Sequence, residues 1–471
     1  MARALLSTTD SAASEPAPPT GGETVASSAS RAARGSEANK PVAKPALSAS
    51  LVLLAPLDAP TADGFDYRVL LLKRHAKSRT YDSAHVMPGG NIDPIDVDAT
   101  TWSSFFPAPA HDSVQQSSDS SRLTAPELQA LKLCALRETF EESGLLLLDP
   151  EPVEPGFNTS VLASLVKKFL PSSPSGEARP GGDGGEGTPA QRWSALAPER
   201  KLYWREEVHR DGKRFVDLLR SLGVDARPAL NLLTHWSNWV TPTLLPRRFD
   251  THFFIAVLPP AVSPLKCAGS SETVPAPTHD SLVSSDGVET TSADWITPAE
   301  GVRRALAYSY ALAKGETAAT PSTTQETPMI LYPPQFNLLA ELAQNHRSLA
   351  SLLDKARSSS TNSRPNGMAS LLVRPRRVVP LTPQVVSVKD DAGRKRRATV
   401  LPGDEAYAYA NEADASLSRP GQRNRTYVLP PMKGQQGLVV EGCLRRGVYK
   451  TLGPGWEDMS AGDVGPDVAK L

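Results

Sequence analysis

Long polar segments interrupt this chain, and they limit how much of it can fold. Residues 1–47 consist mainly of Ala, Ser, Pro, Gly and Glu. That composition buries too little apolar surface to offset the entropy lost on ordering, so we expect a disordered N-terminal segment. What remains predicts one α/β domain over 48–345 and a β-rich C-terminal extension over 368–471. Further Pro-, Gly-, Ser- or Thr-rich stretches predict disordered insertions near 103–125, 171–191 and 269–291, and a linker over 346–367.

Apolar runs bounded by turn residues predict the regular elements of the domain. Residues 126–143 form a predicted helix, since Leu128 and Leu131 begin a pattern of helical spacing. Pro126 suits the first turn of this helix, and Gly144 stands where a C-terminal cap belongs. The other predicted elements are strands at 47–56 and 66–74, a glycine-rich loop at 85–93, helices at 202–223 and 333–345, and a strand at the end of 230–258.

The overall composition narrows the class of protein. Lys+Arg 51 balances Asp+Glu 51, which gives no case for nucleic acid or an anionic membrane as a partner. The apolar runs are too short for a membrane span. The cysteines number 3 and have no paired spacing, which favours a reducing compartment over a disulfide framework or a zinc site. We therefore expect a soluble, intracellular protein.

The last three residues provide a separate indication of location. Ala469, Lys470 and Leu471 resemble the small-basic-Leu address that the peroxisomal import receptor reads at a free carboxyl end. The expected location is the peroxisomal matrix. The alternative is a frayed polar tail on a cytoplasmic or mitochondrial protein.

Three glutamates gather near the C-terminal end of the helix predicted at 126–143. Glu138, Glu141 and Glu142 are spaced so that a helix projects their carboxylates from one face. Like charges repel there, and the helix dipole disfavours anions at that end. A divalent cation opposite them removes this cost, and magnesium prefers such oxygen ligands together with substrate phosphates. The alternative is a solvated helix face whose glutamates pair with distant lysines.

The surroundings of the glutamates favour a phosphoanhydride hydrolase. Arg137 lies beside them and is able to orient one carboxylate through a charge-assisted hydrogen bond. A glycine-rich loop opposite the helix allows its backbone to approach phosphates closely. In such a site metal ions neutralise phosphate charge and lower the pKa of a bound water, and a carboxylate takes the proton.

The segment from Arg137 to Leu145 resembles the second half of the Nudix box, and residues 87–93, MPGGNID, resemble its opening loop. Counted from Gly90, the box places an acid at 96, where Asp96 replaces the usual glutamate. The box arginine, due at 104, is found only at 137, and Thr139 replaces an aliphatic residue. Such an insertion points to the subfamily that contains the peroxisomal coenzyme A diphosphatase. Further stretches that look like this subfamily are 236–254, 333–336 and 401–407.

The resemblance implies roles for the residues of the box. Glu138, Glu141 and Glu142 are expected to bind Mg²⁺ or Mn²⁺, with Glu138 either the third ligand or the general base. Arg137 is expected to orient a glutamate. Gly89 and Gly90 are expected to face the substrate, and the Gly90 carbonyl is a further candidate ligand. Asp96 is either part of the box or the cap of a helical turn.

Residues outside the box each have more than one possible role. Arg247 and Arg248 precede a strand and suit phosphate binding through their planar guanidinium groups, or they are solvent-exposed edge-strand residues. Trp236 and Trp239 are typical of a core, with stacking on adenine as the alternative. Residues 393–397, GRKRR, predict an exposed turn, with a nuclear signal or a phosphate contact as alternatives.

The fold implied by the resemblance is a Nudix α/β/α sandwich with a mixed sheet. The implied activity is metal-dependent hydrolysis of the pyrophosphate of coenzyme A or acyl-CoA, giving adenosine 3′,5′-bisphosphate and (acyl-)4′-phosphopantetheine. One alternative is a Nudix pyrophosphatase for another nucleoside diphosphate derivative, such as NADH or ADP-ribose. Another is a Nudix-fold binding protein without catalysis.

Overall fold

The helices and strands of the described residues all lie in Lys44–Leu471, one of two units of the chain. The computed structural model describes residues 43–75, 83–106, 123–149, 187–243, 245–258, 283–286, 289–314, 329–352, 378–409, 418–429, 439–452 and 456–461. None of the helices in these ranges is both long enough and apolar enough to cross a bilayer.

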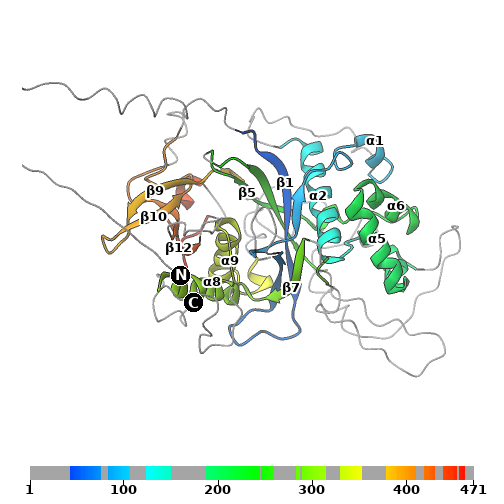
Figure 1. Ribbon diagram of the computed structural model, residues 1–471, viewed down its shortest axis with the longest axis horizontal. Helices are drawn as coiled ribbons and strands as arrows, with labels where there is room; N and C mark the ends of the chain where they lie inside the picture. Colours follow the sequence, from blue (N-terminus) through cyan, green and yellow to red (C-terminus); the bar gives the residue numbers. More distant parts are fainter. Residues whose placement is uncertain are drawn as a thin grey trace, which may run out of the picture. The chain divides into compact units, whose positions relative to one another are not determined.

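A mixed sheet forms the centre of the fold (Figure 1). Within the described ranges it has eight strands, with the order β3-β2-β1-β6-β5-β8, and β4 and β7 pair with β1 and β2 respectively. β1 and β6 run parallel over their whole pairing, from Ala46 opposite Phe249 to Leu54 opposite Val257, and β5 and β8 are also parallel. The strands are β1 (Ala46–Pro56), β2 (Tyr67–Arg74), β3 (His85–Val86), β4 (Gly89–Asn91), β5 (Thr234–Val240), β6 (Phe249–Val257), β7 (Thr290–Ile296) and β8 (Pro380–Leu381).

Helices cover both faces of this sheet. The predicted α/β/α sandwich is confirmed, because alternate residues of β1 enter two different cores. Leu51 and Leu53 pack with residues of α2 (Ala125–Ser143), whereas Val52 and Leu54 share a core with α8 (Pro298–Ala313) and α9 (Pro333–Asn345). Both of these β1 pairs are fully buried.

A third group of helices lies beyond α2 (Figure 1). Leu133 and Phe140 of α2 point away from the sheet and pack against Trp102, Val208 and Phe215. The segments before and after α2, 99–106 and 189–222, therefore share a core of their own on the outer side of α2. Its elements are α1 (Ala99–Trp102), α4 (Pro189–Ala195), α5 (Pro198–Arg210) and α6 (Lys213–Ser221), followed by a short 3-10 helix, η1 (Leu230–Leu232).

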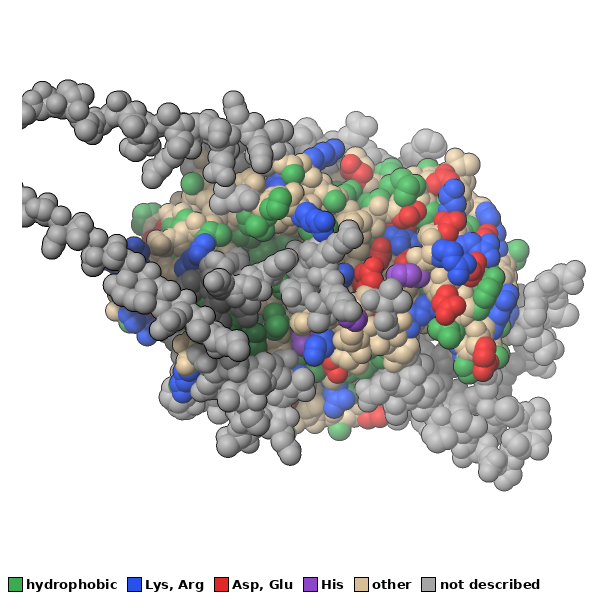
Figure 2. Space-filling model, in the orientation of Figure 1, with side chains coloured by type: hydrophobic (Ala, Val, Ile, Leu, Met, Phe, Trp, Pro, Cys, Tyr) green, Lys and Arg blue, Asp and Glu red, His purple; other side chains and the backbone are tan. Residues whose placement is uncertain are grey.

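The surface of the helices beyond α2 is densely charged. Figure 2 shows basic and acidic side chains interspersed over this side of the molecule. Part of that pattern is a chain of ion pairs in which Glu207 meets Arg210 and Arg214, and Arg214 meets Asp217. Such exposed pairs each contribute little to stability.

The C-terminal extension forms a second sheet, as predicted. Within the described ranges it has five antiparallel strands in the order β13-β12-β11-β10-β9. Val440, Cys443 and Trp456 pack in the same core as α8 and α9. A buried ion pair, Arg445 Nη1 to Glu341 Oε2 at 3.2 Å, also joins this sheet to α9. From β9 onward the elements of the C-terminal extension are β9 (Gln384–Lys389), β10 (Lys395–Val400), β11 (Arg423–Val428), β12 (Val440–Arg446), α12 (Tyr449–Leu452) and β13 (Met459–Ser460).

Several sequence predictions differ from the structure in detail. The segment expected as an insertion over 171–191 ends earlier, because Thr188 forms a capping box with Gln191 and starts α4 at Pro189. Its counterpart over 269–291 also ends earlier, since β7 begins at Thr290. The helix expected over 202–223 is two helices, broken at Asp211–Gly212.

Three further corrections concern segments expected to be irregular. The glycine-rich loop is partly strand, since Gly89–Asn91 pairs with Ser48–Ser50 of β1. The expected linker over 346–367 starts inside the core, where Leu352 is buried. The expected turn over 393–397 continues into β10 from Lys395.

Candidate active site

The sequence around α2 fixes both ends of the helix that carries the glutamates. Thr124 and Glu127 form a reciprocal capping box at the N-terminus, with Pro126 in the first turn. Gly144 ends the helix with φ of 78°, a left-handed conformation that favours glycine, and its N–H donates to the carbonyl of Phe140. These caps set the rotation and the end point of α2, and hence the direction of its last turn.

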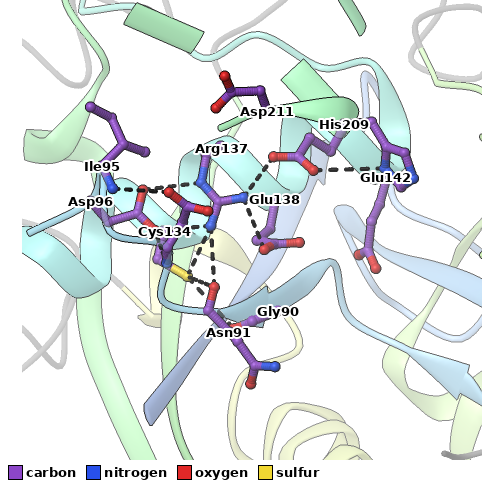
Figure 3. Close-up of polar contacts among 12 residues, drawn as sticks. Gly90, Asn91, Ile95, Asp96, Cys134, Arg137, Glu138, Glu142, His209 and Asp211 are labelled. Carbon is purple, nitrogen blue, oxygen red and sulfur yellow. Dashed lines mark hydrogen bonds and ion pairs between the residues drawn. The ribbon is translucent and has the colours of Figure 1, made fainter. Parts of the chain in front are cut away.

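Arg137 is the centre of a buried network that closes the divided motif (Figure 3). Its Nε and Nη2 donate to the two carboxylate oxygens of Asp96 at 3.0 and 2.9 Å. Its Nη1 donates to Glu141 at 2.6 Å and lies 3.0 Å from Oε1 of Glu138. Nη2 also donates to the carbonyl of Asn91. The loop before the insertion and the helix after it are thus joined by one guanidinium group.

Asp96 pairs with the arginine of the box, and the side chain that caps its turn is that of Asp93, whose Oδ1 accepts from the N–H of Ile95. Asp96 is 2% exposed and holds Arg137 in the bidentate arrangement that planar guanidinium and carboxylate groups favour. Its Oδ2 also accepts from the N–H of Asp93. Thr139, in the place of an aliphatic residue, is fully buried and its Oγ1 donates to the carbonyl of Ala135.

The glycine pair of β4 lies directly against the helix. The N–H of Gly89 donates to Oε2 of Glu142 at 2.8 Å. A Cβ on Gly89 would lie 2.4 Å from the carbonyl oxygen of Ala49, and one on Gly90 would lie 2.4 Å from Cδ of Glu138. Only glycine therefore lets β4 approach both β1 and the glutamates.

Burial, together with neighbouring carboxylate charges, makes the glutamates resist ionisation. Burial raises the pKa of Glu138 to about 7, and the charge of Glu141 adds to the rise while Arg137 opposes it. Burial likewise raises the pKa of Glu141 to about 7 against the opposing effect of Arg137. Burial and then the charge of Glu138 raise the pKa of Glu142 well above its usual range. A cation bound here would relieve this repulsion and favour the ionised forms.

Two residues of α5 reach the C-terminal end of α2, and sequence reasoning did not identify either. Arg205, which is buried, donates from Nε to the backbone carbonyl of Glu141 at 2.7 Å and also bonds Ser284. Nδ1 of His209 lies 3.7 Å from Oε2 of Glu141. A cation at a helix C-terminus is favourable, so Arg205 offsets the charge that the glutamates bring to that end. The period of α5 was visible in the sequence, but nothing in it indicated which helix it contacts.

A cleft of about 860 Å³ opens over the glycine pair. Gly89, Gly90 and Glu138 line it, whereas Glu141 and Glu142 are not part of its lining. Its other walls come from β5, β6, the start of α9 and the C-terminal sheet, and include Trp239, Arg247, Phe249, Pro334, Val385 and Arg397.

The arginines and tryptophans predicted from the sequence divide between this cleft and the core. Arg247 lines the cleft, but Arg248 turns its Nε to the carbonyl of Thr241 at 3.0 Å. Trp236 and Trp239 are both buried in the core on the α8–α9 side of the sheet, as the core reading expected. Trp239 also lines the cleft, so it contributes to both.

The donor set of α2 fits a hard divalent ion in its chemistry. Among the residues that the structure describes, no three His, Cys, Asp or Glu side chains form a ready-made metal cage. Glu138, Glu141 and Glu142 offer only carboxylate oxygens, and burial followed by the charge of a neighbouring glutamate raises the pKa of Glu138 and of Glu142. Oxygen ligands and excess negative charge are what Mg²⁺ and similar ions require.

Comparison with known proteins agrees with this geometry. The NUDT19 Nudix domain matches residues 46–307, more than half of the chain, including the loop, the insertion and α2. The chain belongs to this Nudix hydrolase family. The match covers both halves of the divided box, so the insertion between Asp96 and Arg137 lies within the Nudix domain.

Relatives in this Nudix family are of modest similarity. Acyl-coenzyme A diphosphatase NUDT19 of Xenopus laevis is 33% identical over 257 residues, covering 50% of this chain and 54% of the relative. The protein of that name from Homo sapiens is 33% identical over 232 residues, covering 44% and 52%. The chain thus spans about half the length of the relatives that it matches. A crystal structure of a NUDIX hydrolase from Alicyclobacillus acidocaldarius covers 64% of this chain and 91% of its own, at 20% identity and a TM-score of 0.36.

Proposed function

We propose that this protein hydrolyses the pyrophosphate of coenzyme A or acyl-CoA, giving adenosine 3′,5′-bisphosphate and (acyl-)4′-phosphopantetheine. The observation that carries the proposal is the reassembled box: Arg137 binds Asp96 from before the insertion and Glu138 and Glu141 from after it. An intact network of this kind, at the base of a cleft, is what a working site needs. The relatives named acyl-coenzyme A diphosphatase support this choice of substrate.

Each group of the chain has a part in the proposed reaction. Nudix hydrolases generally use divalent metals, and Glu138, Glu141 and Glu142 would hold Mg²⁺ or Mn²⁺. The bound metal would neutralise phosphate charge and lower the pKa of the attacking water. Gly89 and Gly90 leave room for the diphosphate, since neither has a side chain to block the cleft. Arg137 keeps Glu138 and Glu141 in fixed positions. Glu138, which lines the cleft, would either complete the metal site as the third ligand or accept a proton from water as the general base.

Two alternatives stay open to experiment. A pyrophosphatase for NADH or ADP-ribose would use the same box, because the box residues contact only the shared diphosphate. A Nudix-fold binding protein would need no catalysis at all.

A substrate panel separates these functions. The full chain is incubated with Mg²⁺ and, separately, with acyl-CoA, coenzyme A, NADH or ADP-ribose, and the nucleotide products are identified by mass. Release of adenosine 3′,5′-bisphosphate from the coenzyme A substrates, at a higher kcat/KM than any cleavage of NADH or ADP-ribose, supports the proposal. A higher kcat/KM for NADH or ADP-ribose would show that one of these compounds is the preferred substrate. No cleavage of any compound would favour a Nudix-fold binding protein without catalysis.

Peroxisomal import is a second proposal, and it rests on Ala469, Lys470 and Leu471. These residues lie outside the described ranges. A fluorescent protein fused ahead of residues 462–471 should enter peroxisomes, and the same fusion without the last three residues should stay in the cytosol. Equal distribution of the two fusions would refute the proposal.

A further inference from the structure

The cleft has a second wall that belongs to the C-terminal sheet. Arg397 and Thr399 of β10 and Val385 of β9 all line it. Val385 pairs directly with Thr399, and Arg397 is two residues before Thr399, so strand alternation places all three on one face of the sheet. The opposite face is covered by its own small core, which includes Ala398 and Val400. The orientation of Arg397 toward the cleft is therefore set by the register of β9 and β10.

Arg247 lines the same cleft from the turn between β5 and β6. Arg74 is a third arginine in the lining, but its charge is taken up by Glu289 at 3.2 Å and by Glu142 at 3.9 Å. Neither Arg247 nor Arg397 forms an ion pair or a side-chain hydrogen bond with any residue in the described ranges. Their neighbours in the chain are paired, since Arg248 bonds Thr241 and Arg396 bonds Glu441.

Two guanidinium groups in one cleft, neither paired with a residue in the described part of the chain, point to an anionic ligand. Apart from Glu289, which pairs with Arg74, the described lining has one carboxylate, Glu138, and its charge belongs to the metal-binding set. Guanidinium groups bind phosphate through paired, charge-assisted hydrogen bonds. Apolar residues, among them Trp239 and Phe249, line the cleft as well.

We propose that Arg397 and Arg247 bind a phosphomonoester of the substrate, separate from the diphosphate that is cleaved. The inference rests on the proposed function and deepens it, because coenzyme A carries one phosphomonoester, on the 3′ position of its ribose. NADH and ADP-ribose carry none. The C-terminal sheet is then a specificity-determining part of the site, and Arg397 distinguishes substrates that share the same diphosphate.

The test compares coenzyme A with 3′-dephospho-coenzyme A, which differ only in this group. Wild-type full-length protein should have the higher kcat/KM for coenzyme A. Arg397→Gln and Arg247→Gln should each lower kcat/KM for coenzyme A by about ten- to a hundredfold, the range of a charged hydrogen-bonded contact. Each variant should leave the value for the dephospho compound within about twofold, on the ground that it lacks the contact.

Lys395→Gln is the matched control. Lys395 lies on the same face of β10, also carries one positive charge, and does not line the cleft. Lys395→Gln should leave kcat/KM unchanged for both substrates. An equal fall in kcat/KM for both substrates in Arg397→Gln would place this arginine at the diphosphate instead, and unchanged kcat/KM for both would show that it has no part in recognition. Either result overturns the proposal.

Direct binding keeps the inference testable if the proposed hydrolysis fails. Adenosine 3′,5′-bisphosphate and adenosine 5′-monophosphate are titrated into the full chain by calorimetry without metal. The bisphosphate should bind at least tenfold more tightly, and Arg397→Gln should remove most of this difference. Equal affinities in the wild type would refute the subsite, whereas tighter bisphosphate binding without turnover would refute only the hydrolysis.

Discussion

Replacement of Asp96 tests whether the divided motif works as one unit. Asp96→Asn keeps the size of the side chain but removes its charge and turns an amide group toward the guanidinium of Arg137. Two buried hydrogen bonds, at 3.0 and 2.9 Å, lose their charged acceptor. Breaking a buried ion pair costs about 3–5 kcal/mol. Because Glu138 and Glu141 still lie near Arg137, we expect the lower part of that range, about 3 kcal/mol of unfolding free energy.

The assay is urea unfolding of the variant beside a matched control. Asp98→Asn also neutralises an aspartate of this segment, but Asp98 only caps α1, and Asn is an equally good cap. The control should unfold at nearly the same urea concentration as the wild type. A double-mutant cycle with Arg137→Gln should give a coupling energy above about 1 kcal/mol between positions 96 and 137. Equal stability of the two Asn variants, or a coupling near zero, would refute the reasoning.

Three other changes probe the site. Gly90→Ala places a Cβ 2.4 Å from the carboxyl carbon of Glu138, so turnover should fall by at least about a hundredfold, while the melting temperature changes little because only one side chain is displaced. Burial raises the pKa of Glu138 and Glu141 to about 7, so the contribution of these two groups to the stability of the metal-free protein should be full below pH of about 4.5 and be lost as the pH rises through 7. Mg²⁺ should therefore raise the melting temperature more at pH 8 than at pH 5.5, and an equal rise at both would contradict this. Arg205→Gln removes a charged hydrogen bond to the carbonyl of Glu141 and should cost about 2 kcal/mol in urea unfolding; a loss no larger than that of exposed Arg200→Gln would show that the contact is unimportant.

Local patterns in the sequence were sufficient to predict the central elements. The apolar run of β1 and the capped helix α2 were predicted to within one residue at each end, because their signals are short-range. The mixed α/β fold and the β-rich extension were also predicted correctly. These features depend on periodicity and on residues such as Thr124, Pro126 and Gly144 that act within one turn of the chain.

Contacts between residues far apart in the chain were not predicted from the sequence. The helical period of α5 did not indicate that Arg205 contacts the end of α2. The sequence also did not indicate that the segments before and after α2 share a core around Trp102 and Phe215. The sequence also did not predict that Arg397 lines the cleft, because this position follows from the packing of the C-terminal sheet on α9. The sequence showed a basic run there, with a phosphate contact as one alternative, but it did not indicate which of its residues would line the cleft.

The central claim is that the two halves of the box, separated by an insertion, form one hydrolytic site. The most direct measurement is release of adenosine 3′,5′-bisphosphate from acyl-CoA and Mg²⁺ by the wild type, Glu141→Gln and Glu206→Gln. Glu206 is an exposed glutamate of α5 and serves as the matched control. We predict equal release by the wild type and the control, and a fall of at least about a hundredfold in Glu141→Gln. Equal release by all three proteins would contradict the account, because the carboxylate held by Arg137 would then have no part in the chemistry.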